Sequence, residues 1–297
     1  MQEKIPNDKR SLPYGSAFAI SDFCTLRVLD NGLDLSCLRD EKIVDDFLDL
    51  HRDWVLSSKN NKIVGLDNFK FRCYSNGTSE GFDKFYLANK NRRFRCFRGE
   101  YLYHKLAWRD GFEWDYINDL DISHNDAVVI SLPFADTGNC HEKYKKLLTK
   151  CDYLQVPVLV DCAYFGICKN IEFDLNYSCI TDVMFSLSKA FPVANARIGI
   201  RYSKTDTDDT LFVYKKIDYV NRIGACIGTK FLENFSPDYI PNKYEAMQKN
   251  ICNELNVIPS NTVLFGIAHI GWPEYNRGGE TSRLSFHKQY SKDQDQL

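Results

Sequence analysis

The chain has 297 residues, of which 44% are hydrophobic and 26% are charged, as is ordinary for a soluble globular protein. The formal net charge of -2 gives no overall field that would favour nucleic acid or an anionic membrane surface. No run approaches the roughly 18 apolar residues of a membrane span, and the opening "MQEKIPNDKRSLPYG" lacks the apolar core of a signal peptide.

The N-terminal part is predicted to be an irregular arm followed by one helix. Residues 1–40 contain the turn signals "LPYGS" and "LDNGLD". From Glu41 to Val55, apolar residues recur at helical spacing. We therefore assign residues 1–60 to an arm and a helix.

Short apolar runs then alternate with helical patterns. Strands are expected at 69–75, 92–98, 126–133, 156–163, 182–189 and 196–203, and helices from about Ser79 and over 140–151. Continuous apolar strands between helices indicate a mostly parallel sheet with helices on both faces. We predict a three-layer α/β large domain over 61–205. A reduced α+β small domain over 206–297 would contain a helix at 241–258.

The 11 cysteines are scattered along the chain. None forms a CxxC pair or lies at zinc-ligand spacing from histidines, so the sequence predicts no metal site. No histidine motif marks any of them as a catalytic nucleophile. Cys162 and Cys226 lie in apolar runs, so we expect buried thiols in a reducing compartment, the cytoplasm.

Polar residues follow several of the predicted strands directly. Asn76, Asp136, Asp161 and Lys189 each stand at or just beyond the carboxyl end of a strand. Ligands of open α/β sheets bind at that edge. A carboxylate such as Asp161 could instead cap a helix, but the set of residues indicates a binding site.

These residue types match the chemical needs of pyridoxal phosphate. Its aldehyde requires a lysine amine, and a partly desolvated one is nucleophilic at neutral pH. Its ring nitrogen requires a carboxylate that keeps the ring protonated. Its phosphate requires backbone N–H groups at a helix N-terminus, hydroxyls and an arginine.

Six motifs, in order, resemble those of the fold-type I pyridoxal-phosphate enzymes, in particular the class I/II aminotransferases. "SLSKAFPVANARIG" resembles the Schiff-base segment, and "VLVDCAYFG" the Asp-x-Ala-Tyr strand end. "SNGTSEGF" is similar to the phosphate loop, and "GEYLYH" to the segment whose aromatic ring covers the cofactor. "SLPFADTGN" resembles the Asn-Pro-Thr-Gly turn, and "ETSRLSF" the segment with the carboxylate-binding arginine. The resemblance covers roughly residues 70–203 and 280–286.

The resemblance implies a role for each matching residue around the cofactor. Lys189 would form the Schiff base, Asp161 would pair with the ring nitrogen, and Tyr164 would bind the phenolic oxygen. Ala163 would lie under the ring and Tyr101 over it, with Tyr103 as the alternative. The phosphate would be held by Gly77, Thr78, Ser186, Ser188 and Arg197. Arg283 would bind the substrate α-carboxylate.

The sequence also departs from the family pattern. Ala135 stands where the family has an asparagine that contacts the phenolic oxygen, which leaves that contact to Tyr164 or Asn139. The chain is short, so we expect a more open site or one shaped for a bulky substrate. The tyrosine that the family supplies from a partner subunit has no clear counterpart, and Tyr14 is one candidate.

The resemblance implies a cytoplasmic homodimer that transfers an amino group between an amino acid and a 2-oxo acid. Two alternatives stay open: another reaction on the same cofactor, such as decarboxylation or β-elimination, or a degenerate protein that only binds the cofactor. Residues 89–109 are rich in basic and aromatic side chains, which could bind nucleic acid. The net acidic charge favours an ordinary solvated strand face, so we predict neither nucleic-acid nor membrane partners.

Overall fold

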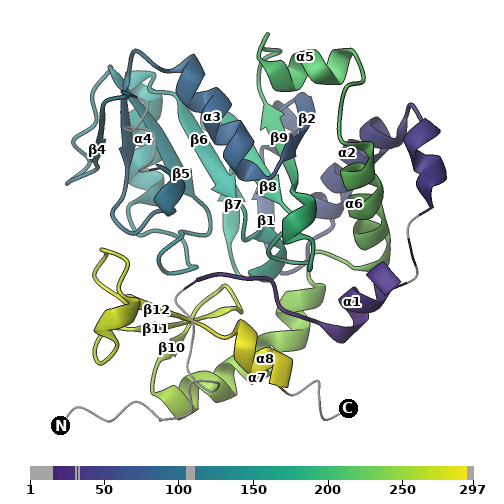
Figure 1. The fold of residues 1–297 in the computed structure, drawn as a ribbon. Coiled ribbons are helices and arrows are strands. Elements are labelled where there is room, and N and C mark those ends of the chain that lie inside the picture. The colour runs from purple at the N-terminus through teal and green to yellow at the C-terminus, as the bar shows by residue number, and fades with distance from the viewer. Residues whose placement is uncertain (1–15, 31, 33, 105–110, 293–297) are drawn as a thin grey trace.

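The computed structural model describes residues 16–30, 32, 34–104 and 111–292, and it separates into a large upper part and a smaller lower part (Figure 1). The large part is built on a seven-stranded sheet of order β2-β9-β8-β6-β5-β3-β4. Its strands are β2 (Phe71–Asn76), β3 (Arg93–Cys96), β4 (Trp114–Tyr116), β5 (Asp126–Ser131), β6 (Val158–Cys162), β8 (Ile180–Ser186) and β9 (Ile198–Ser203). The neighbours from β8 to β4 run parallel, and β9 runs antiparallel to both β8 and β2.

Helices cover both faces of this sheet. α3 (Thr78–Ala88) packs Phe82 and Phe85 on one face, where Ala127 and Val129 of β5 meet it. On the other face lie α2 (Ile43–Leu56), α4 (Tyr144–Leu154) and α6 (Arg222–Asn234), whose apolar side chains join a second core with Val128 and Ile130. Alternate residues of one strand thus enter opposite cores, as the pleat of a strand requires. The predicted three-layer, mostly parallel α/β architecture is confirmed.

The smaller part lies below the sheet in Figure 1. It contains a three-stranded antiparallel sheet of β10 (Ile258–Pro259), β11 (Phe265–Ala268) and β12 (Ser282–Ser285), with α7 (Tyr239–Leu255) and α8 (His287–Lys292). The expected helix at 241–258 ends at Leu255, because Asn256 takes a left-handed conformation and the chain continues into β10. The small C-terminal α+β unit is therefore present.

The boundary between the parts stays a prediction. α5 (Thr210–Lys216) packs on β2, and α6 packs on α2, so both helices lie with the large part. These contacts favour a boundary after Asn234 rather than after residue 205. A separate two-stranded parallel sheet pairs β1 (Lys62–Val64) with β7 (Glu172–Asp174).

The expectation of an irregular arm over residues 1–40 is wrong for part of it. α1 (Phe23–Asp30) and a 3₁₀ turn, η1 (Leu35–Arg39), form there. Asp22 caps α1 by accepting a hydrogen bond of 2.9 Å from the N–H of Thr25. The turn motifs on either side of Asp22 gave no indication of this cap. The same carboxylate accepts a hydrogen bond of 2.8 Å from the hydroxyl of Tyr244 on α7. The arm is thereby tied to the small part.

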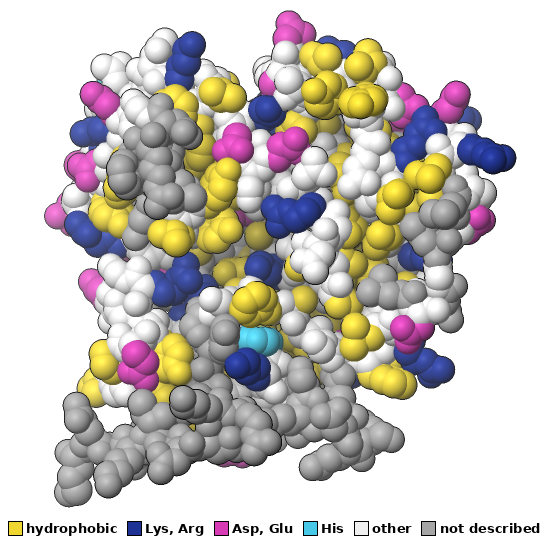
Figure 2. Space-filling model, viewed as in Figure 1, with side chains coloured by type: hydrophobic (Ala, Val, Ile, Leu, Met, Phe, Trp, Pro, Cys, Tyr) yellow, Lys and Arg dark blue, Asp and Glu magenta, His cyan; other side chains and the backbone are white. Residues whose placement is uncertain are grey.

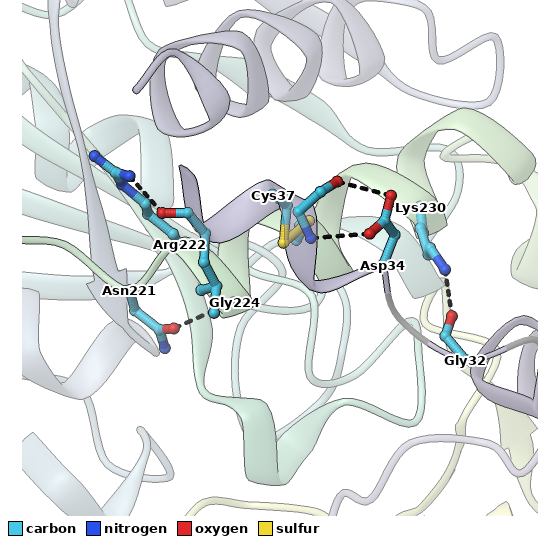
Figure 3. Close-up of a disulfide and its surroundings, with 10 residues drawn as sticks. Gly32, Asp34, Cys37, Asn221, Arg222, Gly224 and Lys230 are labelled. Atoms are coloured by element: carbon cyan, nitrogen blue, oxygen red, sulfur yellow. Dashed lines mark hydrogen bonds between the residues drawn. A yellow bond between two sulfur atoms is a disulfide. The ribbon is translucent and has the colours of Figure 1, made fainter. Parts of the chain in front are cut away.

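The prediction for Cys226 is also wrong. It forms a disulfide with Cys37, which joins η1 to α6 (Figure 3). Asp34 accepts a hydrogen bond from the N–H of Ser36 at the start of η1, and Lys230 on α6 bonds the carbonyl of Gly32. The apolar run around Cys226 gave no indication of a partner 189 residues away. Cys162 is buried, as expected.

Among the described residues, no helix combines the length and the apolar character that crossing a bilayer requires. Within the same residues, no three histidine, cysteine or acidic side chains are grouped so that they could hold a metal ion.

Candidate active site

A cavity of about 330 Å³ opens at the carboxyl ends of the parallel strands, between the sheet and the small part. Its lining residues fall into four groups: the arm (Ser16, Ala17, Phe18), the start of α3 (Thr78, Ser79), the strand ends and following turns (Tyr101, Leu102, Ser131, Pro133, Ala135, Asp161, Ala163, Tyr164, Ser186, Ser188, Lys189, Arg197) and the small part (Arg277, Arg283). All the predicted site residues except Gly77 line this cavity. Figure 2 shows Lys and Arg side chains on this face where the two parts meet.

Gly77 stands at the edge of the cavity as the N-cap of α3. Its φ is +76°, which favours glycine, and a Cβ there would collide with the guanidinium of Arg197. Arg197 donates hydrogen bonds to the carbonyl of Asn76 at 3.1 Å and to the hydroxyl of Ser79 at 3.4 Å. The first N–H groups of an 11-residue helix and an arginine therefore converge on one point, which favours an anion there.

Two serines line the cavity beside the arginine. The hydroxyls of Ser186 and Ser188 lie 2.8 Å apart, and the N–H of Ser188 donates to Ser186 Oγ at 3.2 Å. Ser186 ends β8, and Ser188 lies in the turn that leads to Lys189. The pair thus brings two hydroxyl groups, which can donate to an anion, to the same end of the cavity.

Asp161 lies almost fully buried beneath the cavity, with 4% of its surface exposed. The N–H of Ala163 donates to its Oδ1 at 3.1 Å. Burial and the nearby Glu100 raise the pKa of Asp161 to about 7. A cationic partner in the cavity, such as a protonated ring nitrogen, would favour the ionised form.

Glu100 is a functional candidate that the sequence motifs did not reveal. Its carboxylate accepts hydrogen bonds from the N–H of Ser131 at 2.8 Å and from the Ser131 hydroxyl at 2.6 Å. Ser131 stands beside Asp161 in the register of β5 and β6. The Glu100 carboxylate therefore binds the residue next to Asp161 in the sheet. Burial raises the pKa of Glu100 to about 7. Only its position before Tyr101 could have singled it out.

Lys189 lies in the turn after β8, and its amine lines the cavity. Its Nζ donates a hydrogen bond of 2.7 Å to the carbonyl of Ala17 on the arm. Burial, together with the positive charges of Arg283 and Arg197, lowers the pKa of Lys189 below its ordinary value. A lysine with a lowered pKa is a better nucleophile and base at neutral pH.

Arg283 reaches the cavity from β12 of the small part and is only 1% exposed. Its Nη1 donates to the carbonyl of Ala135 and, at 3.1 Å, to the hydroxyl of Tyr164. Its guanidinium lies over the ring of Phe265, 4.3 Å from the centroid. A backbone carbonyl at residue 135 thus holds the arginine even though the side chain there is a methyl group.

The expectation that Asn139 could replace the missing asparagine is wrong. Its side chain accepts a hydrogen bond of 2.7 Å from the N–H of Asn261, and it does not line the cavity. The turn that carries Asn139 contacts the small part, so Tyr164 is the nearby residue that could donate to the phenolic oxygen.

Of the two tyrosines, Tyr101 lines the cavity and Tyr103 does not. Tyr101 borders the cavity with 43% of its surface exposed, whereas the hydroxyl of Tyr103 donates to Asp83 at 2.8 Å outside it. Tyr14 lies outside the described residues.

Arg277 is a cavity residue that the sequence motifs did not mark. Arg277 lines the cavity, six residues before Arg283, in a segment without a family motif. The carboxylate of Asp136 lies 3.7 Å from its Nε. Burial raises the pKa of Asp136 to about 6, although Arg277 and Arg283 counteract the shift.

No protein-family model and no curated protein sequence matches the chain. Solved structures do resemble it. An aminotransferase from Staphylococcus aureus superposes with a TM-score of 0.65 at 12% identity, covering 98% of this chain and 95% of that one. A C-S lyase from Staphylococcus hominis gives 0.67 at 11% identity, covering 98% and 88%. An L-threonine-O-3-phosphate decarboxylase from Porphyromonas gingivalis gives 0.58 at 14% identity, covering 96% and 99%.

The chain therefore has the fold of the fold-type I pyridoxal-phosphate enzymes, as its motifs implied. Likeness at this level of identity defines the fold and leaves the reaction open, since the three similar proteins catalyse different reactions.

Proposed function

We propose that this chain is a pyridoxal-phosphate-dependent aminotransferase, which moves an amino group between an amino acid and a 2-oxo acid. The observation that carries the proposal is the convergence of Lys189, Asp161 and the Gly77–Arg197 cradle on one cavity. The similar structures support the cofactor, because they include the pyridoxal-phosphate-bound C-S lyase from Staphylococcus hominis.

The residues of the cavity fit this cofactor in both charge and shape. The phosphate would lie where the N-terminus of α3 meets Arg197, with Ser186 and Ser188 beside it, in a cradle that a Cβ at residue 77 would fill. Asp161 would hold the proton of the ring nitrogen, and Tyr164 would donate to the phenolic oxygen. The small side chain of Ala163 and the ring of Tyr101 would border the two ring faces.

When bound, pyridoxal phosphate supplies an electron sink for the charge that develops at the substrate α-carbon. Lys189 would provide the amine that holds the cofactor at its aldehyde. The same Nζ would take the α-proton of the bound substrate and return it. Its lowered pKa favours the unprotonated form that both roles need.

Arg283 favours transamination over decarboxylation. A bidentate pair with the α-carboxylate would hold that group near the plane of the cofactor ring. The bond that stands perpendicular to the ring would then be the one to hydrogen. Decarboxylation requires the carboxylate itself in the perpendicular position.

We also propose a cytoplasmic homodimer. Apolar side chains are exposed on α1, η1, α5, α6 and the α5–α6 connection: Phe23, Leu38, Val213, Tyr214, Ile217, Tyr219 and Ile223. Figure 2 shows hydrophobic side chains gathered over α5. A second copy would cover such a surface. Buried thiols such as Cys162 and Cys168 support a reducing compartment, whereas the Cys37–Cys226 disulfide weighs against it.

The test starts with the purified protein loaded with pyridoxal phosphate. Borohydride reduction and peptide mapping should find the cofactor on Lys189, and a modified lysine elsewhere would refute the assignment. A panel of amino acids without added oxo acid should then convert the cofactor to its pyridoxamine form, with one oxo acid released per cofactor. Release of carbon dioxide, or of product without that conversion, would instead show a decarboxylase or lyase. A yellow colour that no amine discharges would show a protein that only binds the cofactor.

A further inference from the structure

Three arginines line the cavity, and the proposed reaction gives no role to one of them, Arg277. Arg277 lines it together with Arg283, and Arg277 makes no hydrogen bond with any described residue. Its contact with Asp136 is an ion pair at 3.7 Å, longer than a hydrogen bond. Its Nε is buried and has no hydrogen-bond partner among the described residues, whereas a buried donor normally has one.

The local backbone directs Arg277 to the same side as Arg283. Asn276 pairs with Ser282 in an antiparallel bridge, which places Arg277 opposite Thr281. Thr281 and Arg283 are two residues apart and so lie on one face of the ribbon. Diagonal pairs of this kind are about 7–8 Å apart at their α-carbons, within reach of long side chains.

The tip of this hairpin is held beside the cavity. Asn276 Nδ2 donates to the carbonyls of Gly279 at 3.0 Å and Thr281 at 3.1 Å, which closes the loop. A Cβ at Gly279 or Gly99 would collide with Asp136, so the loop packs directly on that carboxylate. Buried Thr281 Oγ1 also has no hydrogen-bond partner among the described residues. The loop therefore brings two unsatisfied donors to one side of the ribbon.

The charges of the lining also remain unbalanced after the cofactor is considered. Four cationic side chains and one carboxylate line the cavity: Lys189, Arg197, Arg277 and Arg283, with Asp161. The cofactor phosphate would occupy Arg197, its aldehyde would occupy Lys189, and the α-carboxylate would occupy Arg283. Arg277 is the cation that remains, and Asp136 behind it is too distant for a hydrogen bond.

We infer that Arg277 binds an anionic group at the end of the substrate side chain, so that the substrate is an amino acid with a terminal carboxylate or phosphate ester. This inference rests on the proposed function and specifies its substrate class. Arg283 binds the α-carboxylate and Arg277 the distal anion. Asp136 keeps the guanidinium of Arg277 in position while leaving its donors available.

Matched pairs of amino acids test the inference. Each anionic substrate has a neutral counterpart of nearly the same shape: L-glutamate with L-glutamine, and L-aspartate with L-asparagine. O-phospho-L-serine distinguishes a phosphate ester from a carboxylate. We expect kcat/KM to favour an anionic member over its neutral counterpart by at least about tenfold, as one charge-assisted hydrogen-bonded pair allows. Preference for the neutral members in every pair overturns the inference.

The variant Arg277→Gln ties any preference to this residue. We expect the ratio of anionic to neutral kcat/KM to fall by about tenfold or more, so that the preference is lost, whereas Arg277→Lys, which keeps the charge, should retain part of it. Lys249→Gln is the matched control, since it removes a cation from α7 outside the cavity and should leave the ratio unchanged. An unchanged ratio in Arg277→Gln overturns the inference.

A binding measurement separates this inference from the proposed reaction. Calorimetry on the pyridoxal-phosphate-loaded protein with glutarate and its monoamide requires no turnover, because neither acid has an amino group. Tighter binding of glutarate, lost in Arg277→Gln, supports the distal anion site whichever reaction follows. Equal binding overturns it even if transamination is confirmed. If Arg277→Gln does not fold, the wild-type comparison of the two acids still decides.

Discussion

The two ends of the cavity are built by different parts of the chain. The end proposed for the cofactor consists of strand ends and the turns that follow them, so Asp161 and Ser186 continue directly from buried strands. The end proposed for the substrate depends on the hairpin at Arg277 and Arg283 and on the arm at Ala17, which reach it from the small part and the N-terminus. We therefore expect cofactor binding to depend on the sheet, and substrate choice to depend on how the arm and the small part pack against it.

The largest expected effect lies at the cofactor end. Asp161→Asn should lower kcat/KM by about 10³-fold or more, because a neutral amide cannot hold the proton on the ring nitrogen. The same variant should unfold at higher urea concentration than the wild type at pH 8 when cofactor is absent, because a buried carboxylate beside Glu100 is removed. Steady-state kinetics and urea titration measure the two effects. A variant that loses stability but keeps its activity would mean that Asp161 has only a structural role.

Paired arginine variants should separate the two ends. Arg197→Gln should weaken binding of pyridoxal phosphate about tenfold to a hundredfold through loss of a charge-assisted contact. Arg283→Gln should instead raise KM for the amino acid by a similar factor while the cofactor stays bound. Cofactor affinity is measured by fluorescence titration, and KM by the half-reaction. If both variants lose the same property, the division of the cavity proposed above is wrong.

A smaller effect is expected at the cradle itself. Gly77→Ala places a Cβ against Arg197 in a backbone conformation of φ +76°, so it should destabilise the protein by about 1–3 kcal/mol. The variant should also weaken cofactor binding, since the Arg197 guanidinium must move. Gly111, with a φ of +82° and no neighbour within 4 Å of a Cβ, provides the matched control for strain alone. Equal cofactor affinity in both alanine variants would show that Gly77 is needed only for its backbone conformation.

The sequence predicted these two ends unequally, and the reason is physical. Strand ends are determined by local patterns, so Asp161 and Lys189 could be placed before their neighbours were known. Gly77 was placed by the resemblance of its segment to the family's phosphate loop. Arg277 and Asp136 meet across 141 positions of the chain, and no local pattern reports such a contact. The Cys37–Cys226 disulfide and the anchoring of the arm by Asp22 escaped for the same reason.

Arg283 shows where a motif helps and where it stops. The "ETSRLSF" segment marked it, yet not the carbonyl of Ala135 that holds its guanidinium. A backbone atom of residue 135 makes this contact, so the alanine there does not remove it. Side-chain identity alone could not have shown this contact.

The smallest effect concerns pH and tests the buried pair beneath the cavity. Burial raises the pKa of Glu100 from 4.5 to about 7, so between these values the folded protein holds a proton that the unfolded chain releases. This contribution to stability is complete below about pH 4.5 and is lost as the pH rises to about 7. Glu100→Gln removes the titration and keeps an acceptor for the N–H of Ser131.

We expect the free energy of unfolding of the cofactor-free variant to fall less between pH 5 and pH 8 than that of the wild type. The difference at pH 8 should be about 1–3 kcal/mol in favour of the variant. Loss of the Glu100 charge should also lower the pKa of Asp161, which that charge now raises, so that Asp161 stays ionised to lower pH. Urea titrations at the two pH values, and the cofactor absorbance followed against pH, measure both effects. Parallel stability curves for the two proteins would mean that Glu100 does not change its protonation between pH 5 and pH 8, which contradicts its raised pKa.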